Sequence, residues 1–304
     1  MHSGENGDNN FYFFTPFIFK PTFQPFVFTC ADGLHYDPNI QACNWPDSVE
    51  CSLGARSNTR TASQFSSPLT RASTDKKVIC YFSNWAGLRS GDGKFLPENI
   101  DASLCSHVVY AFAKLDEESL SMIPSGPKSD LDDKYYRRVE DRVRSTNSGA
   151  PVLLSLGGWS DSSGDKYSRL VNNQEARDNF VKKTVRFLQL HKFDGLVLEW
   201  HFPVCWQSDC TKGPASDKRG FASLVKELKK AFQSKNLVLG ATLSGYKSVI
   251  DAAYDVNTLS DNLDFMNIMT YDFRGFWDGQ TGHHAPLYQD SSDSNTDYNA
   301  VIKS

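Results

Sequence analysis

The 304-residue sequence lacks several features that would place it in a common class of proteins. No apolar run approaches the roughly 20 residues of a membrane span. The net charge of −4 lacks the basic excess that nucleic-acid binders usually carry. There is also no Asn-x-Ser/Thr sequon, so nothing in the sequence supports N-glycosylation. We therefore expect neither a membrane nor a nucleic acid as a partner.

The sequence also contains no Cys-x-x-Cys pair, which argues against a structural zinc site, and we expect no metal. The cysteines favour a disulfide framework and hence an oxidising, extracellular compartment. Their number is odd, so at least one thiol has no partner within the chain. The seven are Cys30, Cys43, Cys51, Cys80, Cys105, Cys205 and Cys210.

Composition divides the chain into four segments. Residues 1–29 look irregular, and their apolar stretch FYFFTPFIF is a poor signal peptide because no Lys or Arg precedes it. Residues 30–51 are compact, turn-rich and too short to bury a core without cross-links. Residues 52–75 are rich in Ser, Thr and Arg and read as a linker. From residue 76 to 304, short apolar runs alternate with amphipathic ones.

Six apolar runs in the last segment predict strands. The runs are continuous, which is typical of parallel strands covered on both faces. They are residues 77–82, 107–113, 151–158, 193–200, 237–243 and 263–272.

Helical spacing of apolar residues appears between these runs. It predicts helices over residues 218–232, with Ser216 or Asp217 as N-cap, and between Asn173 and Leu190. Repeated strand–helix units predict an α/β fold, either a doubly wound sheet or a (β/α) barrel. No Gly-x-Gly-x-x-Gly follows the first strand, which weakens the dinucleotide-binding version.

Polar and aromatic residues gather where the predicted strands end, and in a barrel those ends form the active face. One of these ends, FDGLVLEWHFP (193–203), resembles the signature of family 18 glycoside hydrolases, the chitinases, roughly FDG-x-D-x-D-W-E-Y-P. Four other segments resemble the same family in the same order. They are YFSNWA (81–86), YAFA (110–113), SLGGW (155–159) and MTYDFRGFWDGQTGHHAPLY (269–288).

The resemblance implies a (β/α)8 TIM barrel. Residues 76–304 would hold about six of its eight strands, so we expect a C-terminally truncated barrel. The loop at 204–221 is similar to that of large multi-domain arthropod chitinases.

The N-terminal segment resembles the last part of a peritrophin-A-type chitin-binding domain. This resemblance implies a Cys30–Cys43 disulfide and a partner for Cys51 that the chain lacks. With Cys80–Cys105 and Cys205–Cys210 as the other pairs, Cys51 is left alone.

Chitinases of this family use a substrate-assisted mechanism, which implies no cofactor. The acid after the tryptophan protonates the leaving oxygen, and the substrate's own N-acetyl oxygen attacks the anomeric carbon. The inward column of the family strand is Asp, Asp, Glu; here it is Val197, Glu199 and His201, while Asp194 before it is kept. We read these four residues as a degenerate catalytic site without its carboxylic general acid, and we lean toward a protein that is not an enzyme.

Three readings of Glu199 and His201 stay open: a buried ion pair at the barrel mouth, residual acid–base work, or a metal site. We favour the buried pair. An imidazolium donates a proton, but its ring would place the N–H elsewhere than a carboxyl would. His283 and His284 read as ordinary loop residues.

The resemblance also assigns a sugar-binding set. Each aromatic taken singly favours core packing, but together at strand ends they favour binding. The set is Tyr81, Trp85, Phe112, Trp159, Trp200, Phe202, Met269, Tyr271, Asp272 and Trp277, with Phe202 standing where the family has Tyr.

We therefore expect a catalytically impaired chitinase-like protein that binds chitin or chitooligosaccharides in cuticle or peritrophic-matrix metabolism. One alternative is part of an active chitinase, working through another domain or residual activity. The other is an interaction protein on a chitinase scaffold without sugar affinity.

Overall fold

The chain divides into two compact units, Met1–Lys76 and Lys77–Ser304. The computed structural model describes residues 77–146, 149–277 and 281–288 of the second unit, and four short strands of the first.

Two antiparallel hairpins make up the described part of the first unit. β1 (Asn10–Phe13) pairs with β2 (Phe26–Thr29), and β3 (His35–Asp37) pairs with β4 (Ala42–Asn44). The stretch 1–29, expected to be irregular, therefore contains a hairpin, whose aromatic residues favour strands. The expected Cys30–Cys43 disulfide, the unpaired Cys51 and the linker lie outside the described residues.

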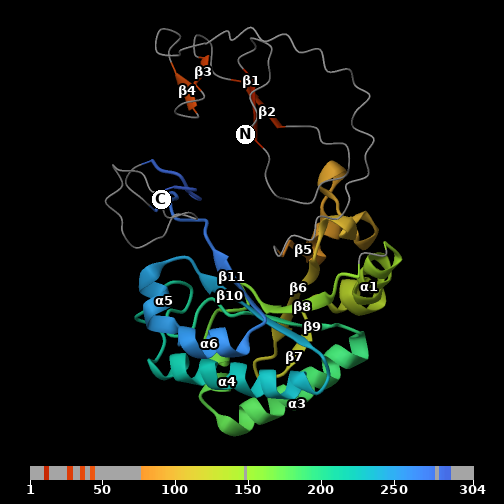
Figure 1. The fold of residues 1–304 in the computed structure, drawn as a ribbon, viewed down its shortest axis with the longest axis vertical. Helices are drawn as coiled ribbons and strands as arrows, with labels where there is room; N and C mark the ends of the chain where they lie inside the picture. The colour runs from red at the N-terminus through yellow and green to blue at the C-terminus, as the bar shows by residue number, and fades with distance from the viewer. Residues whose placement is uncertain are drawn as a thin grey trace. The chain divides into compact units, whose positions relative to one another are not determined.

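A parallel sheet forms the second unit (Figure 1). Its strand order is β5-β6-β8-β9-β10-β11, so neighbours in space are neighbours in sequence, and the six predicted parallel strands are confirmed. A short strand, β7 (Met122–Pro124), pairs antiparallel with β6 and was not predicted. The parallel strands are β5 (Ile79–Ser83), β6 (His107–Leu115), β8 (Val152–Gly157), β9 (Gly195–Glu199), β10 (Val238–Ser244) and β11 (Phe265–Met269).

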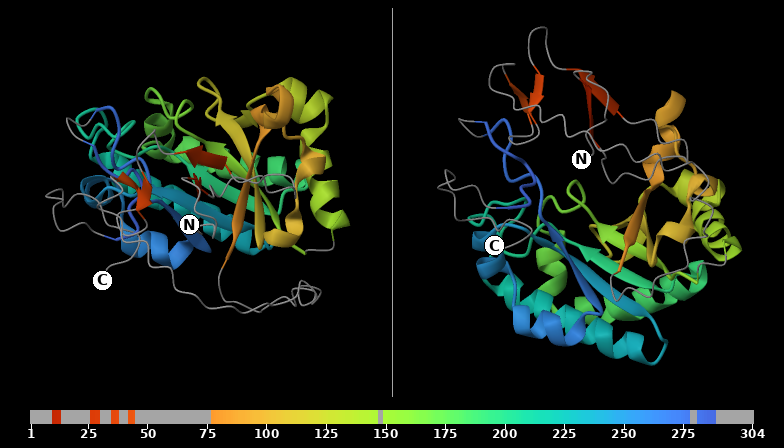
Figure 2. Two further views of the ribbon diagram at one scale, coloured as in Figure 1. Left: turned by 90° about the horizontal axis from the view of Figure 1, so that it is seen from above. Right: turned by 45° about the horizontal axis from the view of Figure 1, so that its top comes forward.

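Helices connect the strands and pack on one side of the sheet (Figures 1 and 2). They are α1 (Tyr135–Ser145), α2 (Lys166–Val171), α3 (Gln174–His191), α4 (Ser216–Gln233), α5 (Lys247–Ala253) and α6 (Val256–Asn262). Short 3-10 turns are η2 (Asn84–Leu88), η3 (Gly91–Gly93), η4 (Pro97–Asn99) and η5 (Ala102–Leu104), and η6 (Lys128–Asp132) is one π-helical turn.

The two predicted helices are confirmed as α3 and α4, but the predicted N-cap of α4 is wrong. The cap position is Ala215, which makes no side-chain cap. Ser216 opens the helix, and the carboxylate of Asp217 points instead to the loop after β9, where it accepts hydrogen bonds from the Val204 N–H and the Trp206 indole. The Asp217 carboxylate therefore binds the loop after β9 and does not cap its own helix.

Most positions on both faces of the strands are apolar, as the continuous runs predicted. The outward face packs against the helices, for example Leu154 and Leu198 against Phe180 and Phe221 in one buried cluster. The inward face forms a smaller cluster of three fully buried residues, Val109, Leu153 and Val197, with four partly buried ones around it: Ile79, Tyr81, Val238 and Phe265.

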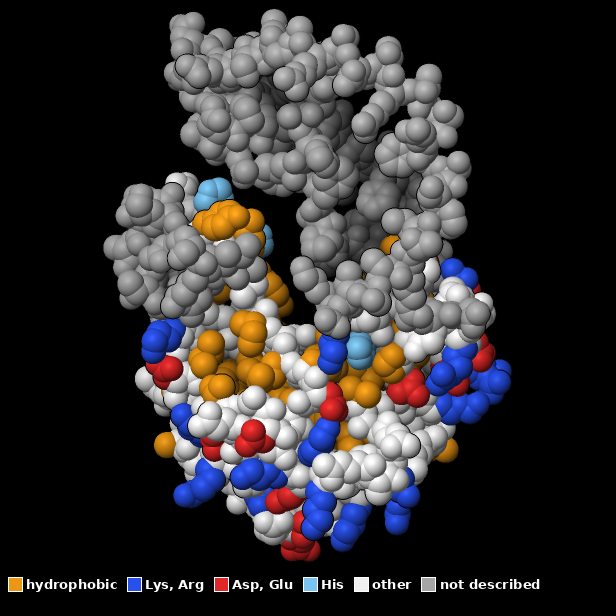
Figure 3. Space-filling view, in the orientation of Figure 1, with side chains coloured by type: hydrophobic (Ala, Val, Ile, Leu, Met, Phe, Trp, Pro, Cys, Tyr) orange, Lys and Arg blue, Asp and Glu red, His pale blue; other side chains and the backbone are white. Residues whose placement is uncertain are grey.

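The sheet curls until its two end strands approach each other. The Lys77 ammonium donates to the Asp264 carbonyl at 2.9 Å, and the His107 and Phe265 rings lie 5.6 Å apart. The Phe265 ring fills the space where Gly240 would carry a Cβ. The result is a six-stranded part of a barrel in which β11 ends the described strand order, and its outward Met266 and Ile268 are exposed. On the face of the second unit that Figure 3 shows, apolar side chains lie among charged ones.

Two expected disulfides are present in the second unit. Cys80 is bonded to Cys105, and Cys205 to Cys210. Among the helices that the structure describes, none has both the length and the apolar character needed to cross a bilayer.

Candidate functional site

The candidate site lies at the carboxyl end of β9, where the alternation of the strand turns three residues inward. Val197 is fully buried, and Glu199 and His201 are 4% and 7% exposed. A strand points successive side chains to opposite faces, so residues 197, 199 and 201 share the inner face, as predicted.

Glu199 accepts hydrogen bonds from three side chains. The hydroxyls of Tyr81 and Thr242 each donate to its Oε1 at 2.8 Å, and His201 Nε2 lies 3.2 Å from its Oε2. The Tyr81 hydroxyl in turn accepts from the Asn267 amide at 2.8 Å. The network therefore joins β5, β9, β10 and β11, and it contains the expected pair of Glu199 and His201.

The tyrosines around Glu199 remain protonated donors. Burial, followed by the charge of Glu199, raises the pKa of Tyr81 far above its ordinary value. Burial and the charges of Glu199 and Asp272 also raise the pKa of Tyr271. The site thus offers neutral hydroxyls around one carboxyl side chain.

Beside this network lies a buried hydroxyl that has no hydrogen-bond partner among the residues that the structure describes. Ser155 is fully buried, and its register partner on β9 is Val197. The inward position that faces this serine is therefore filled by an isopropyl group. A buried hydroxyl without a partner is costly, so position 197 is where a polar side chain would be satisfied.

Two consecutive glycines bring the end of β8 close to the site. Gly157 has φ of 119°, and a Cβ there would lie 2.6 Å from the Glu199 carbonyl oxygen. Gly158 has φ of 89°, and a Cβ would lie 3.0 Å from the Phe112 ring. Only glycine adopts these conformations at so close an approach, which explains the Gly-Gly of SLGGW.

Exposed aromatic rings flank the carboxyl ends of the first strands. Trp85 is 44% exposed and stacks on Phe112, with ring centroids 5.8 Å apart and an interplanar angle of 19°. Trp159 is 52% exposed, and its ring lies 6.3 Å from that of His201. The structure thus brings the predicted Tyr81 and Trp159 to the Glu199–His201 pair, with the Trp85–Phe112 stack packed on Gly158 next to Trp159.

The segment after β11 carries four more predicted residues. Met269 is half-buried, whereas Tyr271 and Trp277 are exposed, and the Trp277 ring lies 5.5 Å from that of Phe276. The exposed Asp272 carboxylate lies 3.6 Å from His284 Nδ1. The charge of Glu199 helps to raise the pKa of Tyr271, whereas no contact among the described residues links Trp277 to the site.

Family comparison supports the motif resemblance. The glycosyl hydrolases family 18 model matches residues 77–303. The chain belongs to this family. A chitin binding Peritrophin-A domain model matches residues 22–51.

Among known proteins, probable chitinase 10 of Drosophila melanogaster is 50% identical over 219 residues, which is 72% of this chain and 9% of that protein. The solved catalytic domain 2 of the Ostrinia furnacalis Group II chitinase is 51% identical, with a TM-score of 0.70 over 72% of this chain and 56% of that one. Human YKL-39, described as a pseudo-chitinase with retained chitooligosaccharide binding properties, is 32% identical, with a TM-score of 0.62 over 72% and 58%. The chain spans little more than half of these solved domains.

Two predicted sugar-binding aromatics of this family 18 domain are buried. Trp200 is 3% exposed and stacks on Tyr167 at 5.5 Å in the layer between sheet and helices. It follows the inward Glu199, so strand alternation turns it outward, and its assignment to the groove is wrong. Phe202 is also 3% exposed and stacks on the His201 ring at 5.1 Å, so it supports that ring rather than offering a face to sugar.

Asp194 was predicted as part of the degenerate catalytic site, but it lies at the opposite end of β9. Its carboxylate accepts the Val152 N–H at 2.8 Å and lies 3.3 Å from an Arg144 guanidinium nitrogen. Five residue steps separate Asp194 from Glu199, so their Cα atoms lie about 16 Å apart along the strand. Asp194 is therefore a structural residue that ties β9 to β8 and α1.

Several site residues were not predicted. Thr242 and Asn267 complete the network around Glu199, and Ser155 and Ser162 are buried hydroxyls close to it. The signal for the first three was a polar residue within an apolar strand. Ser162 lies in a loop, where no pattern distinguished it.

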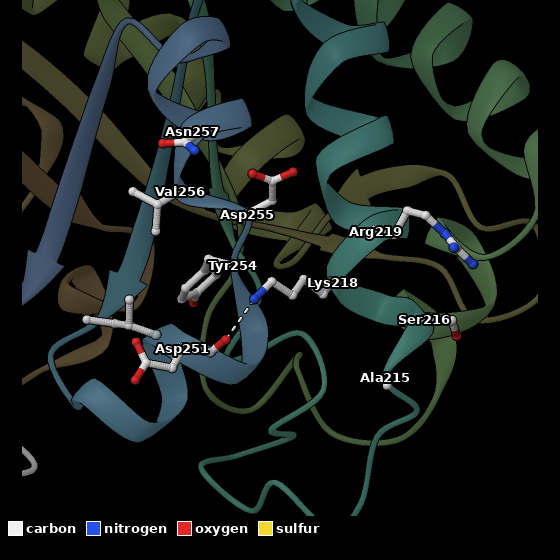
Figure 4. Close-up of a pocket in the computed structure, with 10 residues that line it drawn as sticks. Ala215, Ser216, Lys218, Arg219, Asp251, Tyr254, Asp255, Val256 and Asn257 are labelled. Carbon is white, nitrogen blue, oxygen red and sulfur yellow. Dashed lines mark hydrogen bonds between the residues drawn. The ribbon is translucent and has the colours of Figure 1, made fainter.

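A surface pocket of about 770 Å³ lies elsewhere, between the start of α4 and the α5–α6 connection (Figure 4). Its wall mixes Lys218 and Arg219 with Asp251 and Asp255, and Lys218 already donates to the Asp251 carbonyl at 2.7 Å. None of the predicted site residues lines it. Across the described residues, no three His, Cys, Asp or Glu side chains lie close enough to hold a metal ion.

Proposed function

We propose that the chain is a catalytically impaired chitinase-like protein that binds chitin or chitooligosaccharides at the carboxyl ends of its strands. The observation that carries the proposal is which residues form the inward column at the end of β9 and which partners they bind. His201 stands where the family has its acid, and Glu199 is engaged by Tyr81, Thr242 and His201. A general acid must present its proton to the leaving oxygen, whereas His201 Nε2 faces Glu199.

Retained binding is supported by the exposed rings. Trp85 and Trp159 present faces that would pack on pyranose rings, and the tyrosine hydroxyls nearby stay protonated. Human YKL-39, a relative described as a pseudo-chitinase, is described as retaining chitooligosaccharide binding. A solved relative from Ostrinia furnacalis was obtained in complex with a chitooligosaccharide.

The disulfides and the chitin binding Peritrophin-A match support the further proposal that the protein is secreted and takes part, as a chitin binder, in cuticle or peritrophic-matrix metabolism.

Hydrolysis is tested with a fluorogenic chitooligosaccharide. The unmutated chain is expected to show turnover at least about 10²-fold below that of the family, because a missing general acid costs that much. His201→Glu alone should not restore turnover, whereas Val197→Asp, Glu199→Asp and His201→Glu together should raise it. Strong turnover by the unmutated chain would refute the impairment.

Binding is tested by calorimetry with a tetramer of β-1,4-linked N-acetylglucosamine. Trp159→Ala should weaken affinity about tenfold, since losing an aromatic face costs of the order of 1 kcal/mol. Leu190→Ala, an exposed apolar change on α3, serves as the control. No measurable binding by the unmutated chain would favour an interaction protein without sugar affinity.

A further inference from the structure

One buried hydroxyl connects the loop after β8 to the backbone of the site. Ser162 is fully buried, and its Oγ accepts the His201 N–H at 2.8 Å. The same hydroxyl donates to the Gly158 carbonyl at 2.8 Å, with the Glu199 carbonyl at 3.3 Å as a second acceptor. One side chain therefore touches the backbone on both sides of the candidate site.

The segment that begins at His201 depends on such external support. Val204 has φ of 64° and Gln207 has φ of 49°, conformations that side chains other than glycine rarely adopt. The Val204 N–H donates to the buried Asp217 carboxylate at 3.2 Å. The strained conformation persists because these partners hold it in place.

A second bond returns from this segment to the loop after β8. The Gln207 side-chain amide donates to the Trp159 carbonyl at 3.3 Å, and the Gln207 N–H donates to the His201 carbonyl at 2.8 Å. Hydrogen bonds through Ser162 and through Gln207 therefore link the loop that carries Trp159 to the segment that begins at His201. Ser162 is the member that binds the His201 amide itself, three residues after Trp159.

We propose that Ser162 is a positioning residue of the sugar site. Its hydroxyl sets the placement of the Trp159 ring relative to the Glu199–His201 pair, and through it the affinity for β-1,4-linked N-acetylglucosamine oligomers. This inference rests on the proposed sugar binding. Without the hydroxyl, the His201 N–H is buried with no acceptor, and the segment moves to find one. The lost preorganisation then weakens binding.

Ser162→Ala is the test, with Ser163→Ala as the matched control. Ser163 is the adjacent, exposed serine, and its hydroxyl donates locally to the Ser160 carbonyl. Calorimetry with the N-acetylglucosamine tetramer should show about tenfold weaker binding for Ser162→Ala and unchanged binding for Ser163→Ala, with both variants folded by circular dichroism.

A second readout needs no sugar. The 15N resonances of the His201 ring, observed by NMR, should shift in Ser162→Ala and stay in place in Ser163→Ala. If Ser162→Ala does not fold, Ser162→Cys, which keeps the size and weakens the hydrogen bond, replaces it under the same criteria. Unchanged affinity and unchanged His201 resonances would overturn the proposal. If the unmutated chain binds no sugar, the proposed function fails, while the His201 resonances still decide the role of Ser162.

Discussion

The two ends of β9 carry two carboxylates that do different work. At the amino end, Asp194 is partly exposed and binds a backbone N–H of the neighbouring strand together with Arg144. At the carboxyl end, Glu199 is buried and binds side chains from strands far apart in the sequence. Only Glu199 lies beside exposed aromatic rings. The comparison shows that an acid preserved in a catalytic motif is a functional residue only if the strand places it at the right end.

Asp264 has the same role as Asp194, two strands further along the sheet. Asp264 precedes β11, and its carboxylate accepts the Leu239 N–H of β10 at 2.8 Å and pairs with Lys229 at 2.6 Å. In both places an aspartate just before a strand caps the start of the preceding neighbour and recruits a cation from a helix. Asp194, the aspartate of FDG, and Asp264 therefore have the same structural role, and we call these two aspartates the latches of the sheet.

Removing the Glu199 side chain should have the largest effect on stability. Glu199→Ala leaves the Tyr81 and Thr242 hydroxyls without their buried acceptor, so the free energy of unfolding should fall by about 3 kcal/mol. Urea unfolding followed by circular dichroism measures the loss. Glu118→Ala, at an exposed position, should change little. Equal losses in the two variants would contradict the role of the network.

Removing the latches should separate stability from binding. Asp194→Ala and Asp264→Ala each leave a backbone N–H without its acceptor, and each should cost about 2 kcal/mol. Affinity for the N-acetylglucosamine tetramer should stay unchanged in both, because the latches lie at the far end of the strands. Loss of affinity in folded Asp194→Ala would restore that residue to the site.

A smaller difference in stability is expected between two valine-to-threonine substitutions on the inward face of the sheet. Both valines belong to the inward cluster. Val197→Thr adds a hydroxyl beside Ser155, which has no hydrogen-bond partner among the described residues, whereas Val109→Thr adds one beside Leu153. Val197→Thr should therefore be less destabilising than Val109→Thr by about 1 kcal/mol in urea unfolding. If the costs are equal, Ser155 is satisfied in another way.

The smallest effect should come from pH at the amino end of β6. Burial, followed by the charge of Lys77, lowers the pKa of His107, whose Nδ1 lies 3.0 Å from the Ser106 hydroxyl and whose ring contacts Phe265. The unfolded chain then binds a proton more readily than the folded one, so this contribution to stability is present above the unfolded pKa of about 6.5 and is lost as pH falls below it. His107→Gln should reduce the drop in urea midpoint between pH 7 and pH 5.

Much of the fold follows from local patterns. Continuous apolar runs predicted all six parallel strands, and the alternation within FDGLVLEWHFP predicted that Val197, Glu199 and His201 share one face. The same alternation turns Trp200 outward, so that error was avoidable. A family motif groups residues by sequence, whereas a strand separates them by face and by end.

The partners of Glu199 were beyond local patterns. Tyr81 lies 118 residues before Glu199, and Thr242 lies 43 residues after it. Nothing in the spacing of either residue fixes which strands the curl brings together. The buried Ser162 was hidden for the same reason, since its partners lie on two loops joined only by the fold.

The hydrogen bond between Asn267 and Tyr81 has a consequence for how the chain folds as it is made. These residues are 186 positions apart, and Asn267 lies on the last of the six strands. Asn267 therefore leaves the ribosome long after Tyr81, and until then the Tyr81 hydroxyl lacks the hydrogen bond that Asn267 donates. Contacts of such long range form slowly, so closing the curl is expected to be a late step of folding.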